Sequence, residues 1–215
     1  MLESFATDVD AELMLRARNH DDSESFSLLL GRNRNLVVQY LTRVVQNRAV
    51  AEELAQDVFI RIYRSRHCYE PSARFSTWLY RIATNVALNH LRDQKRHLRD
   101  ISLDVQETDR VRREAPDQGP LIEDELVREA RARQIRRAIQ ALPPKQRTAV
   151  ILHKYQELDY AQIGTALGCT PAAVKALMFR AYETLRVRLR YLVPRSSASP
   201  MDQLAISRPE SSAIG

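Results

Sequence analysis

The amino-acid sequence predicts an all-α protein, with an N-terminal helical bundle and a C-terminal helix-turn-helix domain joined by a flexible linker. Apolar residues recur at three- and four-residue steps through most of the chain, which is the period of amphipathic helices. Only five of the 215 residues are glycine, which disfavours a many-turned β fold and Gly-rich phosphate loops. The helical period disappears in a charged, net acidic stretch that contains Pro116, Gly119 and Pro120. The expected organisation is a first domain at 8–96, a linker at 97–124, a second domain at 125–193 and a disordered tail at 194–215.

About four helices are expected in the first domain. A short helix is predicted from Asp8 to Arg18, and Ser23 is a candidate cap for the longer helix that follows. Gly31 weakens the second helix locally. A third helix is predicted from Ala49 to Arg66, because leucine, valine and isoleucine recur in it at four-residue steps.

The fourth helix of the first domain, expected from Arg74 to Arg96, contains neither glycine nor proline. Leu79, Ile82 and Val86 mark its buried face. A second, polar stripe runs beside that face at helical spacing and consists of Trp78, Arg81, Asn85, Asn89, Arg92 and Arg96. Amides can bond base edges, an aromatic ring can stack on bases and arginines can neutralise phosphates. The alternative reading is an ordinary solvated helix flank with the tryptophan half buried.

The second domain has the signals of a helix-turn-helix unit. Asp159 and Gln162 are spaced as a capping box at the start of a short helix. Gly168 is placed to end that helix in a left-handed conformation. Thr170 caps the next helix, and Pro171 occupies its first position. A helix, a tight glycine turn and a second helix form the motif by which many proteins enter the major groove of DNA.

The last helix should bury one face and expose another. The expected inward residues are Val174, Leu177, Met178, Ala181 and Leu185. The expected outward or marginal residues are Ala172, Lys175, Ala176, Phe179, Arg180, Glu183 and Arg186. An outward Phe179 among basic residues suits contact with a thymine methyl group. The alternative is that Phe179 packs on the preceding helices.

Composition excludes several classes of protein. The net charge of +6 is compatible with a nucleic-acid partner. Cys68 and Cys169 lie far apart without metal-like spacing, so we expect reduced thiols and a cytoplasmic location.

No apolar run reaches the ~20 residues of a membrane span, and the acidic N-terminus does not resemble a signal peptide, so no membrane insertion is expected. No cluster of histidine, cysteine and aspartate supports catalysis, so we expect no enzyme activity, no cofactor and no metal.

Three segments together resemble the extracytoplasmic-function class of sigma-70-type sigma factors. One looks like the helix of this family that binds core polymerase, the next like the helix that opens the promoter, and the last like the start of the C-terminal DNA-binding domain. These segments are 51–59 (AEELAQDVF), 74–85 (RFSTWLYRIATN), and 141–147 (ALPPKQR) followed by 158–168 (LDYAQIGTALG). Their order and spacing fit the family, and the combination is more specific than a helix-turn-helix alone.

The resemblance implies a transcription initiation factor whose partners are core RNA polymerase and promoter DNA. It assigns binding of core polymerase to Glu53, Gln56 and Asp57. It assigns the −10 element to Arg81, Asn85, Asn89, Arg92, Lys95 and Arg96, with the asparagines on exposed bases and the last three residues on phosphates. Relatives are often held inactive by an anti-sigma factor, which is therefore a further expected partner.

The resemblance also places Lys175, Ala176, Phe179 and Arg180 in the major groove of the −35 element. The chain departs from the family here, since relatives often carry serine at the position of Ala176 and arginine or lysine at that of Leu177. The −35 preference of relatives therefore should not be transferred to this chain.

Two other functions compete with this interpretation. A stand-alone helix-turn-helix regulator would need a first domain that senses a ligand or dimerises, and such a sensor usually has a pocket with convergent polar groups. The polar stripe at 78–96 is instead predicted to face outward. An enzyme is the third hypothesis, and no nucleophile or metal-ligand arrangement in the sequence supports it.

Overall fold

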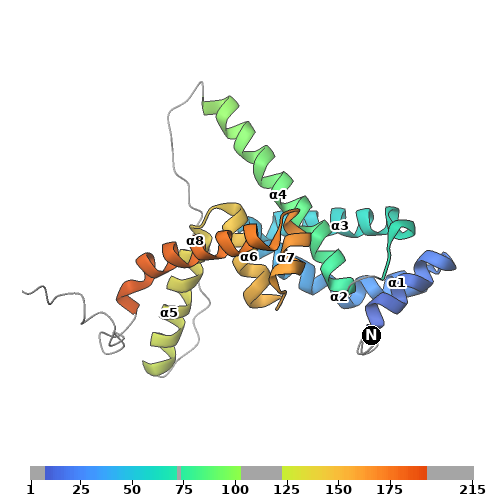
Figure 1. The fold of residues 1–215 in the computed structure, drawn as a ribbon, viewed down its shortest axis with the longest axis horizontal. Helices are drawn as coiled ribbons and strands as arrows, with labels where there is room; N and C mark the ends of the chain where they lie inside the picture. The colour runs from blue at the N-terminus through green and yellow to red at the C-terminus, as the bar shows by residue number, and fades with distance from the viewer. Residues whose placement is uncertain (1–7, 72–73, 103–122, 193–215) are drawn as a thin grey trace, which may run out of the picture.

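The computed structural model describes residues 8–71, 74–102 and 123–192, and all regular structure in these ranges is helical (Figure 1). The elements are α1 (Val9–Asn19), α2 (Ser23–Val45), α3 (Arg48–Arg64), the 3₁₀ turn η1 (Arg66–Cys68), α4 (Phe75–Ser102), α5 (Glu123–Gln140), α6 (Pro144–Tyr155), α7 (Tyr160–Leu167), α8 (Pro171–Leu189) and η2 (Arg190–Leu192). Helices α1 to α4 form the N-terminal domain, and α5 to α8 form the C-terminal domain. The predicted all-α, two-domain fold class is confirmed.

Short polar side chains cap the N-termini of helices α2 and α3 in the N-terminal domain. The carboxylate of Asp22, not the hydroxyl of Ser23, accepts the backbone N–H groups at the start of α2. The hydrogen bonds from the hydroxyl and the N–H of Ser25 hold the pKa of Asp22 below its usual value. Asn47 caps α3 in the same way. Helix α2 continues through Gly31, because Leu29 and other side chains on its inner face are buried and tertiary packing overrides propensity.

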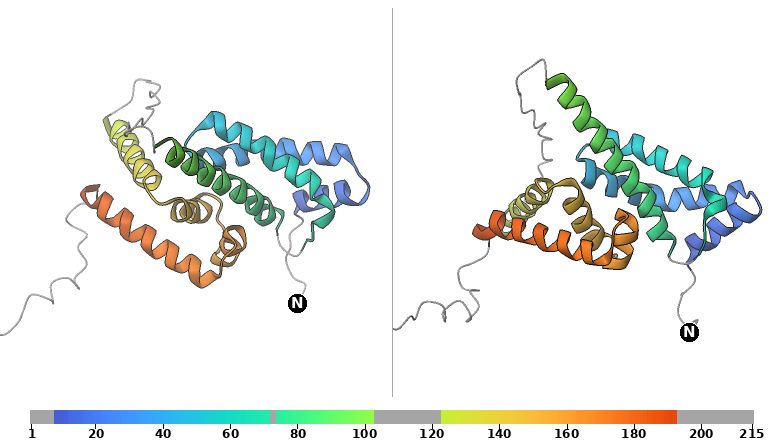
Figure 2. Two further views of the ribbon diagram at one scale, coloured as in Figure 1. Left: turned by 90° about the horizontal axis from the view of Figure 1, so that it is seen from above. Right: turned by 45° about the horizontal axis from the view of Figure 1, so that its top comes forward.

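Helix α4 lies between the other helices of its own domain and the C-terminal domain (Figure 2). Its first residue is tied to the start of α1, since the carboxylate of Asp8 accepts the N–H of Phe75 at 2.8 Å. Further along, the hydroxyl groups of Tyr40 and Thr84 share a buried hydrogen bond of 2.6 Å. Both bonds are formed inside the domain, so they fix the position and the rotation of α4.

The C-terminal domain has the predicted helix-turn-helix. The carboxylate of Asp159 and the amide of Gln162 form the expected capping box at the start of α7. Gly168 ends α7 with a φ of 64°, and Thr170 caps α8. Gly164 is also required, because a Cβ atom there would lie 2.7 Å from the carbonyl oxygen of Cys169.

The boundaries differ from expectation at the end of the N-terminal domain. Helix α4 was predicted to end at Arg96 but continues to Ser102. No glycine or proline interrupts the sequence there, so nothing stops the helix. Most of the predicted linker at 97–124 lies outside the described residues, as does the predicted tail at 194–215. Within the described residues, no helix is both long enough and apolar enough to cross a bilayer.

Gly31 in α2 and Gly164 in α7 allow a matched pair of stability tests. Gly31→Ala should raise the free energy of unfolding by about 0.5–1 kcal/mol, because no atom lies within 4 Å of the added methyl and alanine favours helix. Gly164→Ala should lower it by about 1–3 kcal/mol, because the methyl would overlap a backbone oxygen. Urea unfolding followed by circular dichroism measures both, and a stabilising Gly164→Ala would contradict the packing of this turn.

Candidate nucleic-acid interface

The polar stripe predicted on α4 is present as an exposed surface. The six side chains of α4 that were predicted to contact DNA are all exposed in the structure: Arg81, Asn85, Asn89, Arg92, Lys95 and Arg96. Opposite them, Leu79, Ala83 and Val86 are buried in the N-terminal domain. Fifteen residue steps separate Arg81 from Arg96, which at about 1.5 Å per residue gives a stripe roughly 22 Å long. That length corresponds to about six base pairs of duplex at about 3.4 Å each.

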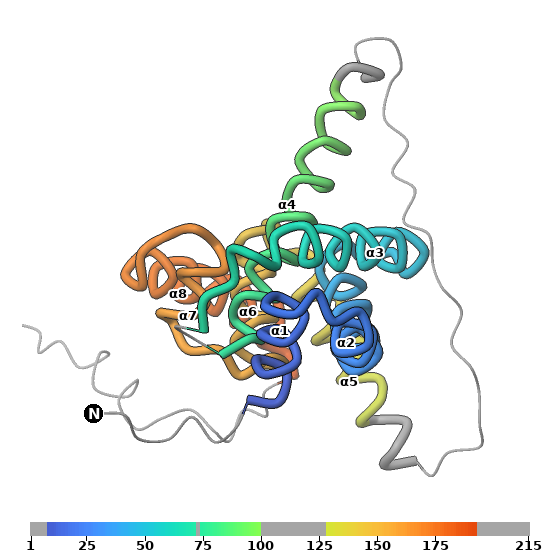
Figure 3. Tube along the Cα trace, turned by 90° about the vertical axis from the view of Figure 1, so that its right-hand side faces the viewer, coloured from blue at the N-terminus to red at the C-terminus, as the bar shows by residue number. Residues whose placement is uncertain are grey.

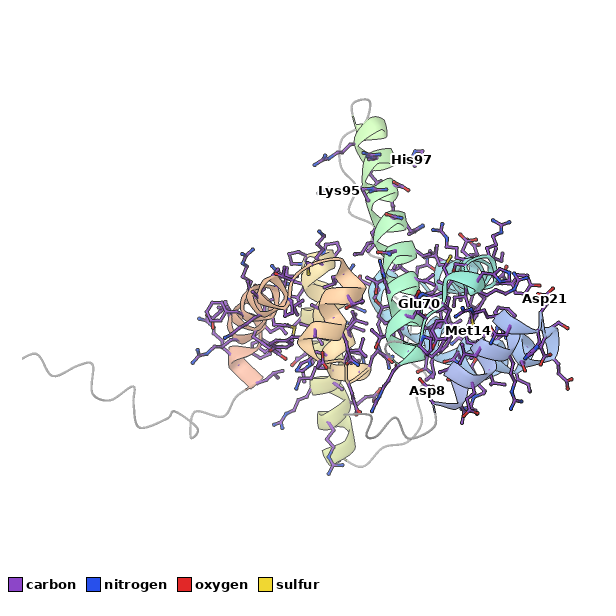
Figure 4. All side chains as sticks on the ribbon, turned by 45° about the vertical axis from the view of Figure 1, so that its right-hand side comes forward. Asp8, Met14, Asp21, Glu70, Lys95 and His97 are labelled. Atoms are coloured by element: carbon purple, nitrogen blue, oxygen red, sulfur yellow. The ribbon has the colours of Figure 1, made fainter. Side chains whose placement is uncertain are left out.

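The far half of the stripe stands clear of both domains. Figure 4 shows Lys95 and His97 on the part of α4 that rises above the rest of the molecule. All residues from 92 to 99 are exposed there. Arg92 lies 3.5 Å from the carboxylate of Asp93, which is a weak, solvent-exposed pair. This segment therefore presents its positive charges to solvent without burying them.

Trp78 begins the stripe in sequence but is held by the domain in the structure. Its ring centroid lies 5.1 Å from that of Tyr69 and 6.0 Å from that of Phe75. Tyr69 and Phe75 are fully buried, whereas Trp78 is half-buried. Burial raises the pKa of the Tyr69 phenol to about 12. Trp78 is thus part of an aromatic cluster that supports the first turns of α4, and the exposed stripe begins at Arg81.

The second predicted DNA surface, on α8, also has the expected orientation. Val174, Met178 and Ala181 are buried, and Leu177 and Leu185 are half-buried. The residues predicted to face outward are all exposed: Ala172, Lys175, Ala176, Phe179, Arg180, Glu183 and Arg186. The side chain of Phe179 is 67% exposed, so it does not pack on the preceding helices. An exposed aromatic ring between Lys175 and Arg180 is chemically suited to a groove that offers both methyl groups and phosphates.

A third surface, on α3, combines acidic and apolar groups. Glu53, Gln56 and Asp57 are exposed on this helix, as the sequence predicted. Next to Gln56, a groove of about 370 Å³ opens between α2 and α3, and its apolar lining includes Phe26, Phe59 and Ile60. This groove was not predicted from the sequence, because its lining residues lie on two different helices that come together only in the folded domain. Exposed isoleucine at position 60, beside acidic residues, was the available signal.

The described residues, 8–71, 74–102 and 123–192, show no cluster of metal-binding side chains. No group of three or more histidine, cysteine, aspartate or glutamate side chains in these ranges could hold a metal ion. The three surfaces differ in chemistry: α4 presents amides and arginines, α8 a mixed aromatic and basic face, and α3 an acidic face beside an apolar groove.

Comparisons with known proteins agree on one family. The Sigma-70 region 2 family model matches residues 29–97, which contain α4 up to His97, and the Sigma-70 region 4 model matches residues 132–185, which contain most of α8. The chain is 37% identical over 163 residues to RNA polymerase sigma factor CarQ of Myxococcus xanthus, covering 76% of this chain and 88% of CarQ. It is 32% identical over 189 residues to the ECF RNA polymerase sigma factor SigW of Bacillus subtilis strain 168, covering 84% and 100%.

A solved structure shows the same fold. The sigma factor RpoE of Bartonella quintana, in complex with the anti-sigma factor NepR, aligns with a TM-score of 0.60 at 20% identity. The alignment covers 78% of this chain and 98% of RpoE. The similarity therefore extends over both helical domains.

Proposed function

The chain belongs to the extracytoplasmic-function class of sigma-70-type RNA polymerase sigma factors, and we propose that its three exposed surfaces divide the tasks of such a factor between them. Sigma factors bind core RNA polymerase and recognise promoters, and they are regulatory, non-catalytic proteins. The main support for this division of tasks is that every predicted contact residue is exposed on its helix, while the opposite face of each helix is buried. Run-off transcription with core polymerase tests the function as a whole.

The stripe on α4 reads and opens the −10 element in this proposal. Asn85 and Asn89 stand one turn apart, so their amides can bond the edges of two bases once these leave the duplex. Arg81 lies one turn before them, and Arg92, Lys95 and Arg96 continue the surface along the DNA backbone. Because the first turns of α4 are held by Asp8 and the aromatic cluster, the amides are presented on a rigid support.

The exposed face of α8 reads the −35 element. Its N-terminal turns carry Lys175 and Ala176, and the next turn carries Phe179 and Arg180. Ala176 offers a methyl group and no hydrogen bond, so discrimination between bases falls on the neighbouring side chains. Leu177 is half-buried in the domain, and it cannot replace a phosphate-binding cation. The −35 preference of this chain should differ accordingly from that of relatives with polar residues at both positions.

The acidic face of α3 binds core polymerase. Glu53 and Asp57 lie one turn apart and have no ion pair within the described residues, whereas the adjacent Glu52 pairs with Arg48 at 3.1 Å. Uncompensated carboxylates beside an apolar groove suit a partner with basic and apolar side chains. We place the chain in the cytoplasm, where RNA polymerase works, and we expect an anti-sigma factor to regulate it, as NepR is bound to the structurally similar RpoE.

A stand-alone helix-turn-helix regulator is the weaker candidate. The N-terminal domain would have to be a sensor or a dimerisation unit in that case. Instead it matches region 2 of sigma factors, and relatives are similar over both domains.

Replacing both Asn85 and Asn89 by alanine should reduce open promoter complexes at least tenfold, since each lost base contact is worth about 1–3 kcal/mol. Affinity for core polymerase should remain within about twofold, because neither side chain lies on α3. Permanganate footprinting measures opening, and a pull-down with core polymerase measures assembly. Asn35→Ala, which removes an exposed amide from α2, is the matched control. Equal loss of opening and assembly would contradict the role assigned to the pair.

Arg180→Ala should change the preference at one or two −35 positions, at a cost of about 1–3 kcal/mol for the preferred base. Binding to a library of −35 variants measures this change. Arg188→Ala removes an equal charge from an exposed position later on the same helix and should weaken all sequences alike. A uniform effect of Arg180→Ala would mean that this side chain holds a phosphate and reads no base.

Replacing both Glu53 and Asp57 by lysine should weaken binding to core polymerase about tenfold at low salt, because it reverses the charge of the proposed docking face. The difference from the unmodified chain should shrink as salt screens the charges. Titration of labelled sigma factor with core polymerase measures both effects. Glu12→Lys changes the charge of an exposed residue on α1 and serves as the control. Unchanged affinity of the double variant would show that core polymerase does not bind through Glu53 and Asp57.

A further inference from the structure

Helix α1 lies outside the part of the chain that the region 2 family model matches, because that match begins at residue 29. It packs on α2, on η1 and on α4. Figure 3 shows α1 beside the stretch of chain that leads from α3 into α4. Leu13, Met14 and Ala17 are buried and attach α1 to the core of its domain. The helix is therefore placed to act on the backbone that enters α4.

Two polar side chains, one near each end of α1, bind that backbone. Near the C-terminal end, the guanidinium of Arg18 donates a hydrogen bond to the carbonyl oxygen of Tyr69 at 2.6 Å. At the N-terminal end, the carboxylate of Asp8 accepts the N–H of Phe75 at 2.8 Å. One helix thus holds the backbone at Tyr69, before α4, and at Phe75, where α4 begins.

Asp8 serves two helices with one carboxylate. One of its oxygens caps α1 by accepting the N–H of Ala11 at 3.2 Å, and the other accepts the N–H of Phe75. The first N–H groups of an α-helix lack partners inside the helix, so an acceptor from outside stabilises the start of α4. Burial, and to a smaller extent the charge of Asp8, raises the pKa of the Tyr69 phenol to about 12. The carboxylate therefore lies close to the aromatic cluster as well as to the first residue of α4.

A third contact lies just beyond the C-terminal end of α1, and Figure 4 shows Asp8 and Asp21 at opposite ends of this helix. The carboxylate of Asp21 pairs with the guanidinium of Arg66 at 2.6 Å. The side chain of Asp21 is 69% exposed, so water competes for the pair and its contribution is small. Arg66 is also held by Tyr63, whose carbonyl oxygen accepts from it at 3.0 Å and whose ring centroid lies 4.2 Å from its guanidinium carbon. Arg18 and Asp8 are therefore the contacts on which the backbone depends.

The start of α4 is one of two points that fix this helix. The other is Thr84, whose hydroxyl is bonded to that of Tyr40. Phe75 lies nine residues before Thr84, and Arg92 lies eight residues after it. The two arms are nearly equal, so a shift of about 1 Å at Phe75 becomes a shift of about 1 Å at Arg92 and about half of that at Asn89. Recognition sites need their groups held to about 0.5 Å, so the start of the helix has to be fixed as well as its middle.

We propose that α1 is a positioning element for promoter opening, in which Arg18 and Asp8 hold the start of α4 so that Asn85 and Asn89 keep their places toward the bases. This inference rests on the proposed role of the α4 stripe. Both positioning side chains bind backbone atoms of the protein, so they influence DNA through α4 and not by contact with it. A function in opening is thereby assigned to a helix that precedes the residues matched by the region 2 model.

Hydrogen exchange of the full-length chain, without DNA, tests whether α1 holds this backbone. Arg18→Met removes the donor and keeps an unbranched side chain. Asp8→Asn keeps one carbonyl oxygen for the cap of α1 and replaces the other acceptor by an amide nitrogen. The combined variant should speed exchange of the Tyr69 and Phe75 amides at least fivefold, while amides in α8 keep their rates. Unchanged exchange at both amides would overturn the inference.

A second pair of charges on α1 supplies the matched control. Arg16→Met with Glu12→Gln removes one positive and one negative charge from exposed positions of the helix, as the combined variant does from its contacts. Exchange at Tyr69 and Phe75 should stay as in the unmodified chain. Equally fast exchange in the control would mean that any charge loss loosens α1, which would count against specific holding by Arg18 and Asp8.

Promoter opening tests the consequence in a double-mutant cycle. The variant with Arg18→Met and Asp8→Asn should form about fivefold fewer open complexes in permanganate footprinting, since a misplacement of about 1 Å can cost up to about a hundredfold in rate. Its affinity for core polymerase should stay within about twofold. In a chain that already carries Asn85→Ala and Asn89→Ala, the same two changes should reduce opening less than about twofold, because no amide pair is left to misplace.

Each other outcome of the cycle has a distinct meaning. A further fivefold loss in the chain without the amide pair would overturn the inference, because α1 would then act by another route. Full opening by the α1 variant would also overturn it if the variant without the amides is defective. If the variant without the amides opens promoters fully, the proposed role of the α4 stripe fails. Exchange at Tyr69 and Phe75 decides even then whether α1 holds the backbone.

Discussion

The rotation of α4 is the constraint on which the rest of the structure depends. A helix has a single orientation about its axis, and that orientation decides which side chains meet the core, the neighbouring domain or the solvent. The bond between Asp8 and Phe75 fixes where α4 begins, and the buried bond between Tyr40 and Thr84 fixes its rotation. A shift of one residue would turn the helix by about 100° and would bury part of the polar stripe. The contacts of this helix with the core, the neighbouring domain and the solvent therefore depend together on two polar contacts, one buried and one partly buried.

In the C-terminal domain, local chemistry fixes where α8 begins and how it is oriented on a small core. This chemistry consists of a capping box at Asp159, a left-handed Gly168 and a capped, proline-led start to α8. Each device is encoded within a few residues. The outer face of α8 is exposed, so its side chains can vary with little effect on the packing of the domain. Phe179 shows this freedom, since 67% of the residue is exposed to solvent.

Local encoding also explains what could be predicted from the sequence. The capping box, Gly168, Thr170 and the inward face of α8 follow from spacing along the chain, and the structure confirms each of them. The bond from Gln46 to Gln140 joins residues 94 positions apart through a backbone carbonyl, which has no signature in the side-chain sequence. The groove between α2 and α3 was not predicted, because its lining side chains come from two helices that meet only in the folded domain. Gly31 shows the opposite case. Its low helix propensity predicts a weak point in α2, but the helix continues because the side chains on the opposite face are buried.

The projecting end of α4 has a consequence for how ions act on this protein. Arg92, Lys95, Arg96 and Arg99 repel one another at three- and four-residue spacing, and no packing offsets the repulsion in a segment that is exposed throughout. Dissolved salt screens this repulsion and favours the helical form, while in the proposed contact with promoter DNA the same salt competes with the phosphates for these charges. Ionic strength thus acts with opposite sign on the local order of the segment and on its affinity. Phosphates of bound DNA would replace the screening ions, so that order and binding rise together only in the complex.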